Sequence, residues 1–279
     1  MKVCIKKDIK NDNIIEFIKI IKEMNNNSQD IILSLFKQSQ KIKIRTPIIV
    51  AITILKRVIE CVNAIIILSI TGYEKDTAIL LLNIIELRLD ISYIAIDCRH
   101  ADTWLNHDKE NRKPWKVNYL INKLYGGNEL KAEQNNYKRF SMIKHGNPMG
   151  GFTSFPFIIS DGNLIIKEKE NIDDFLSIYL FGCGIECCKT NKAIINIGEN
   201  YNYKLDKYKE KLNTLDKCLN DLNYKHVKSM ISELQKQIKL PELCKKCIAV
   251  PEGFIEVRCL LKQVNADYDN FECEFFKQK

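Results

Sequence analysis

The sequence predicts an all-α protein, because apolar residues recur at helical spacing along most of the chain while strand-like runs are confined to one short stretch. The two longest helical patterns, at about 47–70 and 75–97, are separated by a turn of only a few residues. Helices joined so tightly must pack antiparallel, and such a pair is the natural nucleus of a helical bundle.

The elements before and within this hairpin follow from local signals. We expect two short helices at about 13–24 and 29–36, because Asn and Ser residues separate their apolar patterns. The first long helix begins at Thr46, a capping residue that precedes a first-turn proline, and it stops at Gly72. After the second long helix we expect a polar loop with short helices that ends at the paired glycines 126–127.

The second half of the chain is helical with one exception. A helix from about 129 to 145 is stopped by Gly-Asn-Pro, and two β-prone runs around an Asp-Gly pair then predict a small β-hairpin. Helical patterning returns from about 172 to 197, and the charged segment that follows has a narrow seam of Leu and Tyr residues from Leu205 to Leu222. Such a seam either packs on the bundle or pairs with another chain, and its short length favours packing.

These elements divide the chain into five expected parts. They are N-terminal helices that pack on the bundle (1–44), a helical core (45–150), a β-hairpin (151–170), C-terminal helices (171–240) and a cysteine-containing tail (241–279).

The longest apolar run, residues 46–72, is interrupted by Lys56, Arg57, Glu60 and Asn63. Polar groups near the middle of a membrane span are costly, so we expect a buried helix of a soluble bundle and no membrane partner. The N-terminal residues lack the apolar stretch of a secretory signal, and we therefore expect a cytoplasmic protein.

The eleven cysteines do not predict disulfides. Their number is odd, the chain is far larger than domains that need such bonds, and several cysteines lie in apolar helical runs, so we expect reduced thiols. A Cys-x-x-Cys pair in the tail is half of a zinc signature, because the second pair lacks the short spacing. Incidental thiols are the default and no cofactor is expected; the weak candidates for a metal are Cys244, Cys247, Cys259 and Cys273.

The second long helix carries a polar stripe. Glu86 and Asp90 lie four residues apart on one side of it, and the preceding helix offers Arg57 and Glu60. Buried charges are expensive unless they are paired, so we expect Arg57 or Arg139 to meet Glu86 or Asp90. The stripe is either a satisfied network between helices or the wall of an active site.

The helix that ends near residue 145 is the strongest candidate for chemistry. Its last residue, His145, titrates near neutrality, and phosphate-binding groups precede it within about two turns: Tyr137, Lys138, Arg139, Ser141 and Lys144. The formal net charge of +8, from 43 basic and 35 acidic residues, mildly favours a nucleic-acid partner. Capping is the other reading, because a His in the last turn complements the helix dipole and Gly146 can end the helix.

The order of these parts resembles the HEPN superfamily of helical domains, in particular bacterial families found among abortive-infection and toxin-like proteins. The resemblance covers residues 45–148 and rests on the paired helices "RVIECVNAIIIL" and "TAILLLNIIELRLDISYIAID", followed by a helix with an Arg, five residues and a His. It implies an all-α, HEPN-like bundle, here with a small β-hairpin insertion and a helical C-terminal extension.

The resemblance also implies an activity, that of a metal-independent endoribonuclease acting in bacterial defence or as a toxin, commonly as a homodimer. Arg139 and His145 would form the catalytic pair, with substrate-binding residues around them and the polar stripe in support. On an ideal helix this pair lies about 120° apart, whereas Lys138 and Ser141 share a face with His145, so Lys138 is a rival for the cationic role. Active members usually have a small polar residue at the position of Phe140. The alternative is a catalytically inactive binding module whose C-terminal helix holds a protein partner.

Overall fold

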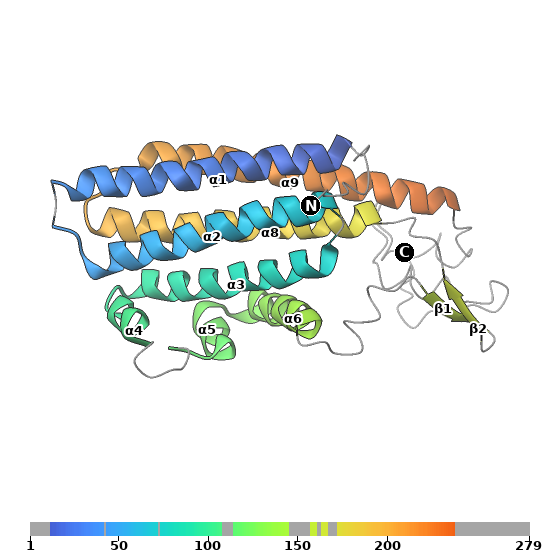
Figure 1. Cartoon of the computed structure of the whole chain (residues 1–279), viewed down its shortest axis with the longest axis horizontal. Helices are drawn as coiled ribbons and strands as arrows, with labels where there is room; N and C mark the ends of the chain where they lie inside the picture. The colour runs from blue at the N-terminus through green and yellow to red at the C-terminus, as the bar shows by residue number, and fades with distance from the viewer. Residues whose placement is uncertain are drawn as a thin grey trace, which may run out of the picture. The chain divides into compact units, whose positions relative to one another are not determined.

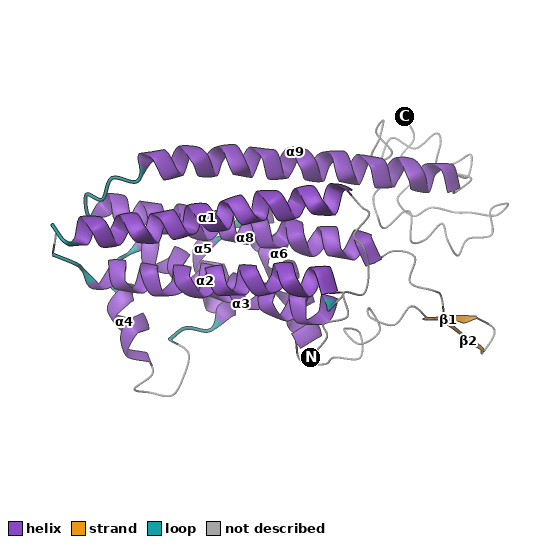
Figure 2. Ribbon diagram, turned by 45° about the horizontal axis from the view of Figure 1, so that its top comes forward, coloured by secondary structure: helices purple, strands orange, loops and turns teal. Residues whose placement is uncertain are grey.

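The computed structural model describes residues 12–41, 43–71, 73–107, 114–144, 157–160, 163–166 and 172–237. The predicted all-α class is confirmed for this part of the chain, which is helical apart from two short strands (Figure 2). Its eight helices are α1 (Asp12–Ser39), α2 (Thr46–Thr71), α3 (Glu74–Ile96), α4 (His100–Asn106), α5 (Val117–Leu124), α6 (Gly127–Lys144), α8 (Ile172–Asn200) and α9 (Asp206–Gln237).

Four long helices form the centre of the bundle. Helix α8 packs against α1, α2 and α3, and α2 also packs against both α1 and α3. Figure 1 shows these four helices side by side, with α4, α5 and α6 along α3. The helices α5 and α6 pack on α3, and α4 packs on α2 and α3. Among the central helices, α3 therefore contacts the layer that carries the candidate motif. No helix in the described ranges is long and apolar enough to cross a membrane.

The expectation of two short N-terminal helices is wrong, because α1 is one continuous helix of 28 residues. Three polar residues of the predicted break, Asn25, Asn27 and Ser28, are buried and hydrogen-bonded to distant parts of the chain. Asn25 Nδ2 donates to Asn63 Oδ1 at 2.9 Å, and Asn191 Nδ2 donates to Ser28 Oγ at 2.9 Å. Tertiary partners thus bind the amide nitrogen of Asn25 and the hydroxyl of Ser28, groups that would otherwise favour a turn.

The chain divides into two compact units, Met1–Leu219 and Asn220–Lys279, and the bundle belongs to the first. Within the first unit the leucines of the predicted seam are buried, which confirms that this part of the seam packs on its own bundle: Leu205, Leu212, Leu215 and Leu219. Of the second unit the structure describes residues 220–237, which are helical.

Two short strands, β1 (Phe157–Ser160) and β2 (Asn163–Ile166), pair antiparallel. In this register Phe157 lies opposite Ile166, and Ser160 lies opposite Asn163. The placement of these two strands as an insertion in a HEPN-like bundle remains a prediction.

The turn between α8 and α9 depends on a close approach at Gly198. A Cβ atom added there would lie 2.6 Å from Leu205 Cδ1, and Leu205 has no exposed surface into which it could move. We therefore expect Gly198→Ala to lower the free energy of unfolding by about 1–3 kcal/mol through overpacking. This loss exceeds the stability that alanine gains over glycine through its higher helix propensity. Urea denaturation measures the change.

The matched control is Gly126→Ala, since an added Cβ at Gly126 meets nothing within 4 Å. That variant should stay within about 0.5 kcal/mol of the parent chain. Equal loss of stability in both variants would contradict the packing argument.

Candidate functional site

Helix α6 carries the predicted motif and lies against α3 and α5. Phe140 is buried, and its ring contacts that of Tyr179 on α8 with centroids 6.1 Å apart. Lys138 is exposed and Ser141 is half-buried. The helix is described as far as Lys144, so His145 lies outside the described residues; Arg139 belongs to the helix, but its side chain is not described. Phe140 therefore anchors the motif helix in the core.

Two residues of α6 reach the polar stripe of α3 at one point. The hydroxyl of Tyr137 donates a hydrogen bond to Glu86 Oε1 at 3.2 Å, and Lys144 Nζ lies 3.8 Å from the same oxygen. Burial, together with the Glu86 carboxylate, raises the pKa of Tyr137 to about 12, so its hydroxyl stays a donor at neutral pH. The predicted substrate-binding set and the predicted supporting network thus meet at Glu86.

On the stripe, a pocket of about 210 Å³ opens between α2, α3, α4 and the start of α5. Asp90 accepts a hydrogen bond from Trp104 Nε1 at 3.1 Å. Glu60 is exposed on α2 and does not line this pocket. Three predicted network residues and both tryptophans of the chain are among its lining residues: Arg57, Cys61, Asn83, Glu86, Leu87, Asp90, Trp104, His107, Pro114, Trp115 and Val117.

Aromatic contacts hold one wall of this pocket in place. The rings of Trp115 and Tyr93 meet edge to face with their centroids 5.0 Å apart. The His100 ring stacks on Tyr93 with centroids 4.0 Å apart and ring planes 10° from parallel. The hydroxyls of Tyr93 and Tyr119 hydrogen-bond each other at 3.0 Å. Because both tyrosines lie on packed helices, the indole of Trp115 is fixed relative to α3.

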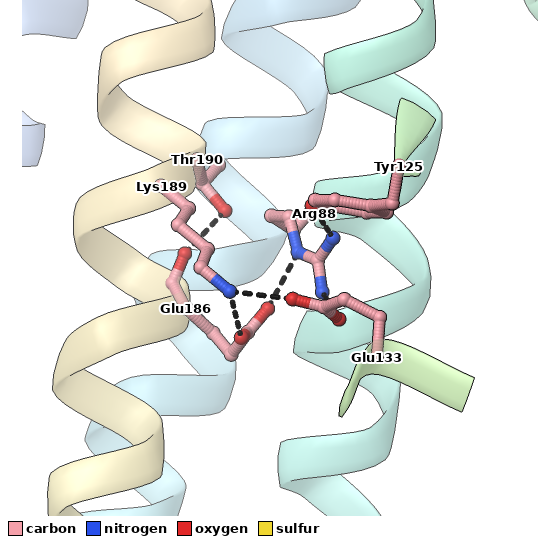
Figure 3. A network of polar contacts seen from close by, with 6 residues as sticks. All are labelled: Arg88, Tyr125, Glu133, Glu186, Lys189 and Thr190. Atoms are coloured by element: carbon pink, nitrogen blue, oxygen red, sulfur yellow. Dashed lines mark hydrogen bonds and ion pairs between the residues drawn. The ribbon is translucent and has the colours of Figure 1, made fainter. Parts of the chain in front are cut away.

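A second polar group, the Arg88 network, lies deeper in the bundle (Figure 3). The guanidinium of Arg88 donates to Glu186 Oε2 at 2.6 Å, to Glu133 Oε2 at 2.7 Å and to the hydroxyl of Tyr125 at 2.5 Å. Lys189 Nζ donates to Glu133 Oε1 at 2.6 Å and to Glu186 Oε1 at 3.4 Å. Two cations and two carboxylates therefore balance one another across α3, α6 and α8.

The electrostatics of the Arg88 network favour the charged forms of Arg88, Lys189 and Glu133. Burial by itself lowers the pKa of Arg88, but Glu186, Tyr125 and Glu133 more than offset it, so the pKa lies above its ordinary value. Burial raises the pKa of Glu133, whereas Arg88 and Lys189 lower it, and the net shift is downward from 4.5. The network is a structural clamp that fixes α6 against α3 and α8.

Sequence reasoning missed Arg88. The stripe it singled out contains Glu86, and Arg88 lies two residues further on, about 200° around the helix and so on another face. The available signal was Arg88 between two leucines on α3, together with Glu186 in the apolar run of α8. A single buried charge on each of two helices predicts a pair, although not which third helix supplies the remaining partner.

The cysteines of the described residues are free thiols. Cys183 and Cys187 are fully buried, and burial raises the pKa of both, which leaves them protonated and unreactive at neutral pH. Within the described ranges no group of three or more His, Cys, Asp or Glu side chains could hold a metal ion. The candidate zinc ligands of the tail lie outside these ranges: Cys244, Cys247, Cys259 and Cys273.

Removal of the central cation should destabilise the bundle strongly. Arg88→Met leaves Glu133 and Glu186 buried with one cation between them, and breaking a buried ion pair in this way costs about 3–5 kcal/mol. Urea denaturation measures the loss. The control is Arg99→Met, which removes an ion pair to Asp97 of equal length, 2.6 Å, at a side chain that is 91% exposed. Its unfolding midpoint should not change; equal losses would contradict the role of burial.

The lowered pKa of Glu133 predicts a pH dependence. A carboxyl group whose folded-state pKa is depressed adds stability above its unfolded pKa of about 4.5, and this is lost as the pH falls through the folded value. Between about pH 5 and pH 3 the parent chain should therefore lose stability more steeply than Glu133→Gln, as measured by urea midpoints. Glu129→Gln, an exposed site at the start of α6, should keep the parent slope. Parallel curves for the parent chain and Glu133→Gln would contradict the assignment.

No protein-family model matches this chain, and no curated protein or solved structure matches it either. The likeness to HEPN domains therefore rests on the residues of the α2–α3 hairpin and of the Arg–His motif, and it stays a prediction.

Proposed function

We propose that this chain is a HEPN-like, metal-independent endoribonuclease that acts in bacterial defence or as a toxin. Its active centre would lie at the C-terminal end of α6, where Arg139 and His145 form the catalytic pair. Lys138, Ser141 and Lys144 would hold the RNA backbone.

One observation supports this proposal most directly. Tyr137 and Lys144, which flank Arg139 by sequence, both reach Glu86 in the middle of the polar stripe. They lie seven residues apart, or about two helical turns, and their side chains converge on one carboxylate oxygen of the stripe. A positively charged helix end beside a half-buried carboxylate is an arrangement that can bind phosphate and orient a proton-transfer group.

In the proposed reaction the RNA 2′-hydroxyl attacks the neighbouring phosphorus. His145 takes the proton from that hydroxyl or gives one to the leaving 5′-oxygen, and Arg139 stabilises the charge on the phosphoryl oxygens. The bond from phosphorus to the 5′-oxygen breaks, so the products are a 2′,3′-cyclic phosphate and a free 5′-hydroxyl. The site would be completed by a second copy of the chain.

The second candidate is a catalytically inactive binding module. The pocket beside the motif favours it, because charged side chains and both tryptophans of the chain line it together: Arg57, Glu86, Asp90, Trp104 and Trp115. A pocket with such a lining suits a bound ligand or a side chain of a protein partner.

RNA incubated with the purified full chain in EDTA should yield fragments with cyclic-phosphate ends. His145→Ala and Arg139→Ala should each lower the cleavage rate by about a hundredfold or more, the range expected for loss of general acid–base catalysis. Lys131→Ala, an exposed site on the same helix, is the matched control and should cleave at the parent rate.

A mixture of His145→Ala and Arg139→Ala tests whether a second copy of the chain completes the active site. If Arg139 and His145 act across a homodimer, mixing the variants should restore part of the activity. Absence of cleavage by the folded parent chain, or unchanged cleavage by His145→Ala, would leave the binding module as the better reading.

A further inference from the structure

We propose that one end of the bundle, which we call the basic end, is a second contact site for single-stranded RNA. Its six basic residues lie at the connection from α1 to α2 and at the turn from α8 to α9: Lys37, Lys41, Lys43, Arg45, Lys204 and Lys207. None of them belongs to the motif helix α6. The choice of RNA as the ligand rests on the proposed function, but binding and cleavage are measured separately, so each proposal can fail alone.

The two connections of the basic end are held against each other by hydrogen bonds. Gln38 Nε2 donates to the carbonyl oxygen of Lys204 at 3.2 Å, and Gln38 Oε1 accepts from the backbone N–H of Lys204 at 2.9 Å. The hydroxyls of Ser39 and Tyr203 hydrogen-bond each other at 2.8 Å. Figure 1 shows both connections at the same end of the bundle. Cations from two distant parts of the sequence are therefore collected in one region.

The charge of the basic end is not balanced by its own residues. Residues 37–45 contain four basic and no acidic side chains, and residues 201–207 contain two basic side chains and one acidic, Asp206. All six basic side chains are exposed, and none of them is in an ion pair with any residue that the structure describes. By contrast, the exposed Lys192 and Lys209 have carboxylate partners at 2.7 and 2.9 Å. Mutual repulsion of unpaired cations is relieved when a polyanion binds.

Carboxylates at neighbouring helix ends reduce this positive charge only in part. They are Asp97, Asp102, Glu199 and Asp206. Asp97 and Glu199 are each paired with a basic side chain outside the six, at 2.6 and 2.9 Å. Asp102 and Asp206 lie in the first turns of α4 and α9, where the helix dipole partly offsets a negative charge. Six cations thus stand against two remaining carboxylates, and the region keeps a net positive charge.

An exposed aromatic ring adjoins these cations. Phe36 is 51% exposed in the last turn of α1, directly before Lys37. The unpaired bases of single-stranded RNA stack on such rings, while lysine and arginine side chains bind its phosphates. A base stacked on Phe36 would remove the ring from water. The ring beside the cations therefore favours a single strand over a double helix, whose bases already stack on one another.

The surroundings of Phe36 do not suit a membrane surface, the other polyanion that basic residues bind. A helix that lies in a membrane interface has a broad apolar face. On α1 the exposed apolar residue nearest to Phe36 is Leu33, and the exposed residues that precede Leu33 are polar or acidic: Asn26, Gln29 and Asp30. Two apolar side chains beside an acidic one give little area to insert between lipids.

Binding can be measured without cleavage. RNA with 2′-O-methyl groups lacks the hydroxyl that attacks phosphorus, so a labelled 2′-O-methyl oligouridylate of about ten nucleotides reports binding alone through its fluorescence anisotropy. The full chain should bind it, and the logarithm of the affinity should fall linearly with the logarithm of the salt concentration. Absence of binding by the folded chain at low salt would overturn the proposal.

A fourfold variant of the basic end locates the site: Lys41→Gln, Lys43→Gln, Arg45→Gln and Lys204→Gln together. It should bind at least about tenfold more weakly near 0.1 M salt, and its salt slope should fall by about 2–3, since each phosphate contact to a single strand contributes about 0.7.

The matched control removes the same charge from exposed lysines elsewhere on the bundle: Lys22→Gln, Lys56→Gln, Lys211→Gln and Lys217→Gln together. It should keep the salt slope of the parent chain, and circular dichroism establishes that both variants are folded. Equal weakening by the two variants would reveal a general effect of net charge and overturn the site.

The ring is tested by Phe36→Ala. Loss of one stacked base should weaken binding by at least about fivefold and leave the salt slope unchanged, because stacking releases no counterions. Leu33→Ala, one turn earlier on the exposed side of α1, removes an apolar side chain that cannot stack and should bind as the parent chain does. An equal loss in both variants would overturn the assignment of Phe36 to base stacking.

Cleavage of unmodified RNA separates this proposal from the proposed function. If the fourfold variant loses binding while the parent chain binds but cuts no RNA, the contact site stands and the nuclease fails. If the parent chain cuts RNA and the fourfold variant binds and cuts equally well, the nuclease stands and the contact site fails. Sedimentation of the parent chain, but not of the fourfold variant, with phosphatidylserine vesicles and without RNA binding would assign the basic end to a membrane surface and overturn the proposal.

Discussion

Arg88 has no surface exposed to water, yet its guanidinium carries a full charge in the middle of the bundle. The desolvation of such a charge costs several kcal/mol unless hydrogen bonds and opposite charges surround it. Glu186 of α8, Glu133 of α6 and the hydroxyl of Tyr125 meet this requirement in three directions, and Lys189 balances the second carboxylate. Since these partners come from separate elements, the relative positions of α3, α6 and α8 follow from the need to pair one charge.

The position of α6 in turn determines what its outer residues can reach. With Glu133 held by Arg88 and Phe140 packed beside Tyr179, the helix has two fixed points seven residues apart. Tyr137 lies between them and meets Glu86, and Lys144, about two turns further along α6, reaches the same carboxylate. The candidate motif is therefore attached to a rigid support, which is what a proton-transfer site needs.

Glu86 connects two polar regions of the bundle. Tyr137 and Lys144 of α6 reach this carboxylate, and the pocket that it lines also contains Arg57, Asp90 and both tryptophans of the chain. Glu86 belongs to both, because it accepts from Tyr137 of the motif helix and also lines the pocket. A change of charge at Glu86 would therefore act on the motif helix and on the pocket together.

The sequence by itself determined the helices, above all the hairpin of α2 and α3 and the start of α8, since helical spacing and stop residues are local signals. It also indicated that Glu86 and Asp90 share a stripe. Only the tertiary structure decided that α1 continues through its polar middle, because the partners of Asn25 and Ser28 lie 38 and 163 residues away. The partners of Arg88 are likewise 37 to 98 residues distant, and the pocket draws on three helices and the start of a fourth. Whether a buried polar group is satisfied depends on atoms that no local stretch of sequence contains.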